Sequence, residues 1–343
     1  MASPQHASAF MVASQSQFAL HPPCHPAHTY LTVGGDAFPV AVGLVTNMIS
    51  LIWNYLYSTL LRSWMKWILR KLTGRCELQR ICASTVQRAE RTMKIEYSLK
   101  SSKNEVLKTS VDGSVENVEK SIQDIMEIKK ISIQKDPDFK INLQICLLQI
   151  SGFKKLFADV EYLRKQPFES SNKQHEDMLL KLWQLMMPHV HLESRITKQW
   201  GDIGFQGEDP KTDFRGMGML GLHNLVFFGE HYTKVARQTL SRSNHPKIGY
   251  SYAIVGINLT EMAYSMMKSG LLKSHFYNLV PGVPQLQHFH QFYCYLLYEF
   301  DQFWFKEGPS SIMEFNQYRE QFHERVKRLL QDPKALLTLN FKK

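Results

Sequence analysis

The chain has 343 residues, of which 44% are hydrophobic, so it can bury a substantial core in one large domain or two modest ones. Its five cysteines are scattered, odd in number and never spaced as CxxC, which argues against both a disulfide framework and a structural zinc site. No segment matches a Walker phosphate loop, a GxSxG elbow or an HExxH helix, so the common nucleotide-binding, hydrolase and metalloprotease signatures are missing.

The formal net charge of +10 is concentrated in one region. Residues 62–108 hold twelve Lys and Arg against four Glu, a local net charge of +8. Such a patch suits an anionic lipid surface or a nucleic acid, and a solvated helix face is the alternative. Two histidine pairs, His189 with His191 and His288 with His290, lack a carboxylate or cysteine at ligand spacing, so we interpret them as structural and predict no metal site.

Residues 1–47 contain a single charged side chain, Asp36, and show no helical or strand period. We expect a disordered extension. A secretory signal would need a basic region, but no Lys or Arg precedes Arg62, and Met48 is an alternative start of the chain.

Residues 48–75 are predicted to form an amphipathic helix with a basic flank. The stretch 37–61 has no charge and is long enough to span a bilayer. Polar residues nevertheless recur every three or four positions from Asn47 to Arg70, which favours a helix lying in the membrane interface over one that spans it. Packing on its own domain remains an alternative. The predicted membrane-contact residues are Trp53, Leu56, Leu60, Arg62, Trp64, Lys66, Trp67, Arg70 and Lys71.

Residues 77–339 are predicted to form one all-α globular domain, because strand alternation of any length is absent. Helical faces recur at 115–126, 141–150, 153–163, 178–186, 250–267 and 289–304. We expect Gly152 to end one helix, one of Ser170, Ser171 and Asn172 to cap another, and Gly270 to stop a third. Ser311 and Glu314 have the spacing of a capping box for a last helix. The buried side of that helix is predicted to be Phe315, Phe322, Val326, Leu329 and Leu330.

Between these helices lies a glycine-rich motif, residues 200–225, with the sequence WGDIGFQGEDPKTDFRGMGMLGLHNL. Closely spaced glycines allow sharp turns and close approach to a partner, while Asp-Pro and Thr-Asp supply turn and cap groups. A single arginine, Arg215, lies among them. It can pair with Asp202, Asp209 or Asp213 and so tie the turn together, or it can reach into another molecule. The two roles are compatible with each other.

The supporting positions of the motif have more ordinary interpretations. The aromatic side chains are expected to anchor the turn by packing, and Gln206 to close it with a hydrogen bond, with contact to a partner as its alternative role. The full set of motif-support residues is Trp200, Gly204, Phe205, Gln206, Gly207, Asp209, Pro210, Thr212, Asp213, Phe214, Gly216 and Gly218.

The motif resembles that of the ELMO-domain-containing (ELMOD) family. Sixteen residues carry the resemblance, and they include Ile203 to Gly207, Asp209-Pro210 and Thr212 to Gly216. The segments 71–80 and 249–262 also resemble the family, and the similarity extends from Met48 to about Leu339. Residues 1–47 depart from it, because the relatives begin near the position of Met48.

The resemblance implies a GTPase-activating protein for Arf and Arf-like small GTPases, in which Arg215 matches the arginine that the activity needs. GTP and its magnesium ion would then be bound by the partner, and this chain would need no cofactor. The expected location is cytoplasmic and peripheral to organelle membranes, or else a single N-terminal span with the domain in the cytosol. A non-catalytic adaptor for GTP-loaded partners is the alternative. Nucleic-acid binding is disfavoured, because the basic residues flank a tryptophan-rich apolar face, and the oligomeric state stays open.

Overall fold

The computed structural model describes residues 61–85 and 88–339. For Arg62 and Ser63 it describes the backbone but not the side chains. This part of the chain is helical and contains no β-strand, so the predicted all-α class is confirmed. The chain divides into two compact units, Met1–Cys76 and Glu77–Lys343. The predicted extension 1–47 and the predicted helix as far as residue 60 lie outside the described residues.

In the first unit the structure describes one helix, α2 (Arg62–Thr73). Gly74 ends it in the left-handed conformation, with φ of +67°, and its N–H donates to the carbonyl of Arg70 at 2.9 Å. Across residues 61–85 and 88–339, no helix is both long enough and apolar enough to cross a bilayer.

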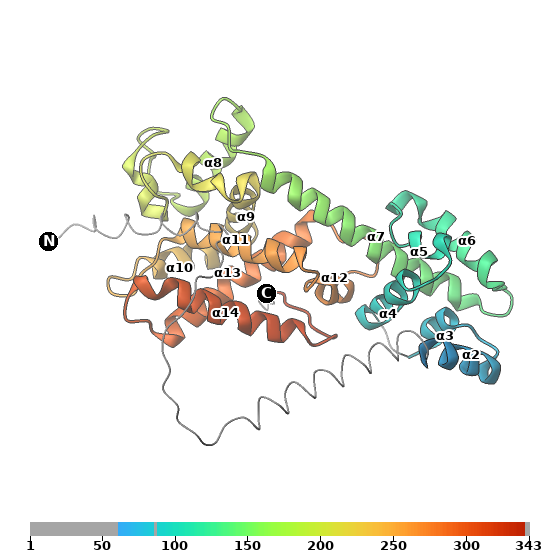
Figure 1. Cartoon of the computed structure of the whole chain (residues 1–343). Helices are drawn as coiled ribbons and strands as arrows, with labels where there is room; N and C mark the ends of the chain where they lie inside the picture. The colour runs from blue at the N-terminus through green and yellow to red at the C-terminus, as the bar shows by residue number, and fades with distance from the viewer. Residues whose placement is uncertain (1–60, 86–87, 340–343) are drawn as a thin grey trace, which may run out of the picture. The chain divides into compact units, whose positions relative to one another are not determined.

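The second unit is built from α-helices and short 3₁₀ turns (Figure 1). In chain order they are α3 (Glu77–Ala83), α4 (Ala89–Lys100), α5 (Glu105–Thr109), η3 (Val115–Asn117), α6 (Val118–Lys129), α7 (Pro137–Lys165), α8 (Lys173–Met186), η4 (Lys198–Ile203), η5 (Pro210–Arg215), α9 (Gly218–His231), α10 (Thr233–Ser243), α11 (Tyr252–Lys268), α12 (Lys273–Leu279), α13 (Leu286–Glu307), η6 (Ile312–Glu314) and α14 (Phe315–Leu330).

Helix α9 is the centre of the core. It packs against α7, α8, α10, α11 and α13, and it is apolar around most of its circumference. Helix α7 is the long element of the unit: its 29 residues span about 44 Å at 1.5 Å per residue. Figure 1 shows it running from α6 and α4 to α8 and α9. The glycine-rich motif is therefore the segment that leads into the central helix.

The prediction that Gly152 ends a helix is wrong, because α7 continues through it to Lys165. A Cβ atom at this position would lie 2.8 Å from Pro284 and 3.0 Å from Val283. Glycine is thus present because the 283–284 segment packs directly on the helix. A glycine inside a helix costs about 1 kcal/mol relative to alanine, and burial of the flanking residues Leu147, Ile150 and Leu156 offsets this cost.

Other local predictions hold more closely. Asn172 caps α8, with its side-chain oxygen accepting the N–H of Gln174 at 2.9 Å, and Gly270 follows α11 with φ of +82°. The helical face predicted for 289–304 is buried in α13, where most of its side chains are aromatic. At the last helix, four of the five predicted positions are buried, but Leu329 is 44% exposed.

The predicted capping box at α14 differs from the observed geometry. Ser311 caps η6 by accepting the N–H of Met313 at 3.2 Å, and the Glu314 carboxylate accepts the N–H of Ser310 at 2.9 Å. The two side chains therefore stabilise a 3₁₀ turn that precedes the helix, and α14 itself begins at Phe315.

Candidate functional site

The glycine-rich motif folds as two 3₁₀ turns, η4 and η5, followed by the start of α9. Each turn has a side-chain cap: Thr197 accepts the N–H of Gln199 at 3.3 Å, and Asp209 accepts the N–H of Lys211 at 3.0 Å. Pro210 occupies the first position of η5, where a missing N–H is harmless. Because both turns are capped, the backbone around residue 215 is held by local hydrogen bonds.

A line of buried aromatic rings anchors the motif. Trp200 packs edge-on against Trp183 of α8 and against Phe205. Phe205 in turn packs edge-on against Phe214, and Phe214 stacks on Phe168. The ring centroids of each pair are 5.4–5.8 Å apart. Trp200, Phe205 and Phe214 are at most 5% exposed. The three residues predicted to anchor the turn by packing are thus buried, and they attach η4 and η5 to the core.

Two glycines attach the motif to neighbouring helices. Gly204 has φ of +83°, and a Cβ atom there would lie 2.3 Å from the backbone nitrogen of Tyr252, at the start of α11. Gly218 has φ of +51°, and its Cβ would lie 2.4 Å from the carbonyl oxygen of Gln166, at the end of α7. No side chain fits at either position without moving backbone. These glycines are required by the fold.

Gly207 and Gly216 are both exposed, and a Cβ atom at either would meet no atom within 4 Å. Gly207 still favours glycine through its backbone, because its φ is +71°. Gly216 instead has an ordinary helical φ of −79°, so nothing in the described structure requires glycine there. It directly follows Arg215. A bare backbone beside the arginine leaves room for a second molecule to approach.

The Asp213 carboxylate closes the turn from inside by accepting the backbone N–H of Gln206 at 2.8 Å. The closing bond predicted for Gln206 thus uses its backbone, not its side chain. Burial raises the pKa of Asp213 to about 6, and the negative charge of Asp209 also raises it. The hydrogen bond from Gln206 and the positive charge of Arg215 lower this pKa, but by less. Thr212 lies on the exposed side, with its hydroxyl 3.4 Å from the carbonyl of Asp209.

Arg215 is exposed, and its Nε donates to the carbonyl of Thr212 at 2.9 Å. Within the described ranges, no carboxylate lies within 4 Å of its guanidinium nitrogens, so the expected alternative of an ion pair with Asp202, Asp209 or Asp213 does not occur there. The Nε bond orients the side chain along η5 and leaves both terminal nitrogens available as donors.

The structure identifies a second arginine that the sequence did not reveal. Arg195 bonds the carboxylates of Glu176 in α8 and of Asp209, the latter at 2.9 Å. Its carbonyl accepts the indole N–H of Trp200 at 2.9 Å, and its guanidinium lies 5.6 Å from the centre of the Phe168 ring. Arg195 is therefore the residue that ties the motif together, the role considered for Arg215.

The predicted membrane-contact residues are only partly described. Trp53, Leu56, Leu60 and the side chain of Arg62 lie outside the described residues. On α2, Trp64 and Trp67 are each 59% exposed, and they share this short helix with Lys66, Arg70 and Lys71. Exposed tryptophans beside basic residues are the arrangement found in helices that lie in a membrane interface.

Comparisons with known proteins agree with this architecture. The model of the ELMO/CED-12 family matches residues 158–319. Human ELMO domain-containing protein 2 is 60% identical over 288 residues, covering 84% of this chain and 98% of the human protein. The chain belongs to the ELMO/CED-12 family. ELMO domain-containing protein 1 of Mus musculus is 54% identical, with coverage of 84% and 93%, and ELMO domain-containing protein B of Dictyostelium discoideum is 35% identical, with coverage of 76% and 92%.

The residues matched by the ELMO/CED-12 model contain the whole glycine-rich motif together with the helices that hold it. They run from within α7 to within α14 and so include α8, α9, α11 and α13. Arg195, Arg215 and both of the glycines that the fold requires lie inside this ELMO region. Helices α2 to α6 precede it.

Proposed function

We propose that this chain is a GTPase-activating protein for Arf and Arf-like small GTPases, and that Arg215 supplies a cation to the partner's nucleotide. The observation that carries the proposal is the exposed Arg215 guanidinium, which has no carboxylate partner in the described structure and is held on a capped turn beside an open Gly216. The nucleotide and its magnesium ion belong to the partner.

The chemistry favours an arginine in this role. In GTP hydrolysis, negative charge develops on the transferred phosphoryl group and on the leaving oxygen. Both side chains carry a positive charge at physiological pH, but the planar guanidinium donates to two oxygens at once, a geometry that a lysine ammonium does not reproduce. An arginine supplied in this way accelerates hydrolysis by about 10³- to 10⁵-fold.

The test is single-turnover GTP hydrolysis by an Arf-like GTPase with the full chain and with Arg215→Lys and Arg215→Ala. We expect both variants to lose at least about 10³-fold in stimulated rate. Lys234→Ala, which removes an exposed positive charge on α10, serves as the control and should keep full stimulation. Folded Arg215 variants that stimulate as well as the wild type would contradict the proposal.

The same variants separate catalysis from an adaptor function. A non-catalytic adaptor binds the GTP-loaded partner without accelerating hydrolysis, and Arg215→Ala then lowers affinity alone. Affinity for a GTPase loaded with a non-hydrolysable GTP analogue should therefore be measured beside the hydrolysis rate. An activator keeps most of its affinity in Arg215→Lys while losing stimulation, because the ammonium retains the charge but not the two-oxygen geometry.

We further propose that α2 brings the domain to anionic membranes, where lipidated GTPases are concentrated. Exposed Trp64 and Trp67 beside basic side chains support this. Trp64→Ser/Trp67→Ser should weaken co-flotation with phosphatidylserine vesicles, whereas Ile133→Ser, an exposed apolar residue of the second unit, should not. Release of the full chain from membranes at alkaline pH would support interfacial attachment, and retention would support a span.

A further inference from the structure

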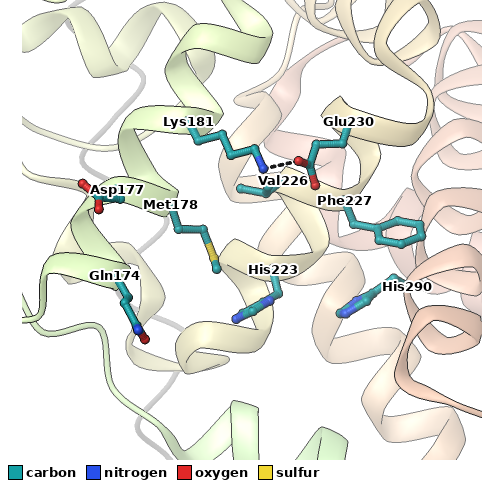
Figure 2. Close-up of a pocket in the computed structure, with 9 residues that line it drawn as sticks. All are labelled: Gln174, Asp177, Met178, Lys181, His223, Val226, Phe227, Glu230 and His290. Carbon is teal, nitrogen blue, oxygen red and sulfur yellow. Dashed lines mark ion pairs between the residues drawn. The ribbon is translucent and has the colours of Figure 1, made fainter.

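A pocket of about 370 Å³ lies between α8, α9 and α13 (Figure 2), and Arg215 is not among the residues that line it. Four residues of α8 and four of α9 form its walls, and His290 of α13 completes it. This volume falls within the range of small-molecule sites in proteins. Neither the proposed GTPase activation nor the membrane contact uses the pocket.

The tautomer of His290 is determined by a chain of buried hydrogen bonds. The Thr260 hydroxyl donates its only hydrogen to the carbonyl of Gly256 at 3.0 Å, so its oxygen accepts the side-chain N–H of Asn224, also at 3.0 Å. This orients the Asn224 amide with its oxygen toward His290, 2.6 Å from Nδ1. The proton of His290 therefore lies on Nδ1, and Nε2 is a hydrogen-bond acceptor.

No donor for this acceptor exists in the part of the chain that the structure describes. His290 is only 6% exposed, and what exposure it has is toward the pocket that it lines. Burial, together with the neighbouring His223 and His231, lowers the pKa of His290 to about 3, so the ring stays neutral and keeps its lone pair. Nε2 therefore faces the pocket as an accessible acceptor, and a ligand that enters the pocket with an N–H or O–H group can donate to it in place of water.

The other walls indicate what kind of molecule fits. Met178, Val226 and Phe227 are apolar, and the Phe227 ring lies 5.1 Å from that of His290. The His223 ring is parallel to His290, at 6.2 Å between centroids, and burial lowers its pKa as well. These surfaces favour a flat apolar body.

The charged groups of the pocket argue against an anionic ligand. Lys181 and Glu230 form an ion pair at the rim, as Figure 2 shows, and Asp177 adds a further carboxylate, so the lining carries a formal charge of −1. An anion would meet one unneutralised carboxylate and two neutral imidazoles, and therefore no unpaired cation.

We propose that this pocket binds a small, planar, uncharged molecule that donates an N–H or O–H group to Nε2 of His290. The ring of the ligand lies against Phe227 and His223, and its donor group points to the buried end of the pocket. This site is independent of the proposed GTPase activation.

Indole and 1-methylindole test the proposal, because they share size and flatness and differ in the N–H donor. In the full chain with ¹⁵N-labelled histidine, indole should shift the Nε2 resonance of His290 and bind on the order of tenfold more tightly than 1-methylindole. His290→Phe should abolish this preference, and Met178→Trp, which fills the pocket but keeps His290, should weaken binding of both probes.

Equal affinity of the two probes for the wild-type chain would overturn the proposal, and so would an unshifted His290 resonance at saturating indole. A preference for indole that persists in His290→Phe would place the donor contact elsewhere and have the same consequence. If His290→Phe does not fold, the wild-type shift and the Met178→Trp comparison still decide the question.

Discussion

Arg195 and Arg215 belong to the same small region but are held in opposite ways. The Arg195 side chain is 24% exposed and bonds two carboxylates, whereas Arg215 is exposed and, among the described residues, bonds only a backbone carbonyl. The available carboxylates explain the difference, since Asp209 is used by Arg195 and Asp213 by the Gln206 N–H. Arg195 and the backbone of Gln206 thus each bind one of the carboxylates that could otherwise hold Arg215.

The two arginines should differ most in whether their substitution lowers the rate of stimulated hydrolysis or the free energy of unfolding. Arg215→Ala should remove about 4 kcal/mol of transition-state stabilisation while changing the free energy of unfolding by less than about 0.5 kcal/mol, because its side chain makes one exposed hydrogen bond. Urea denaturation and single-turnover hydrolysis on the same sample measure both. A loss of stability comparable to the loss of rate would mean that Arg215 is structural.

Two glycines on either side of Met217 allow the next comparison. Gly218→Ala should lower the free energy of unfolding by about 3 kcal/mol, because the new methyl group meets carbonyl oxygens of α7 and φ is positive. Gly216→Ala should change it by less than about 0.5 kcal/mol and should lower stimulated hydrolysis, because the methyl group occupies the surface offered to the partner. Full stimulation by Gly216→Ala would argue against close approach at this point.

Arg195→Met should be costly for the fold. The change leaves the partly buried carboxylates of Glu176 and Asp209 without their cation, and we expect the free energy of unfolding to fall by about 2 kcal/mol. Lys198→Met is the matched control, since Lys198 is 83% exposed and its distance to Glu208 is 4.0 Å. Equal denaturation midpoints for the two variants would show that the Arg195 contacts contribute little.

The smallest expected effect concerns Asp213, whose pKa in the folded state is about 6. An unfolded aspartate titrates near 3.9, so the folded state favours the protonated form. The resulting stability is present below about pH 4 and is lost as the pH rises through 6. Relative to Asp213→Asn, the wild type should lose about 1 kcal/mol between pH 4 and pH 7, a value reduced for partial exposure.

The pKa of Asp213 also reports on its neighbour. Because the charge of Arg215 lowers this pKa, Arg215→Ala should raise it further. A ¹³C titration of the carboxyl group measures the shift. An unchanged pKa in the variant would show that Arg215 spends little time near Asp213.

Much of the fold follows from local patterns in the sequence. The aromatic face of α13, the Asn172 cap and the glycine after α11 each depend on residues within one or two turns, so period and cap chemistry identify them. The predicted helix end at Gly152 is wrong because the reason for this glycine, contact with residues 283–284, lies far along the chain. Tertiary packing overrides helix propensity there.

The site shows the same division. The motif and its arginine can be identified from residues that are adjacent in the sequence. The structural role of Arg195 cannot, because its partners Glu176 and Asp209 lie 19 and 14 residues away. The buried chain from His290 to Gly256 joins three helices and has no local signal at all. The exposure of Arg215 likewise depends on which carboxylates other residues have already bound.

The two glycines that the fold requires also affect how the domain assembles. Gly204 lies against the start of α11 and Gly218 against the end of α7, so the backbone around Arg215 reaches its shape only when helices distant in the sequence have docked. Contacts of this kind carry a loop-closure cost and slow folding relative to local ones. A peptide cut from the motif would lack both supports, and a partly folded chain would not present the arginine.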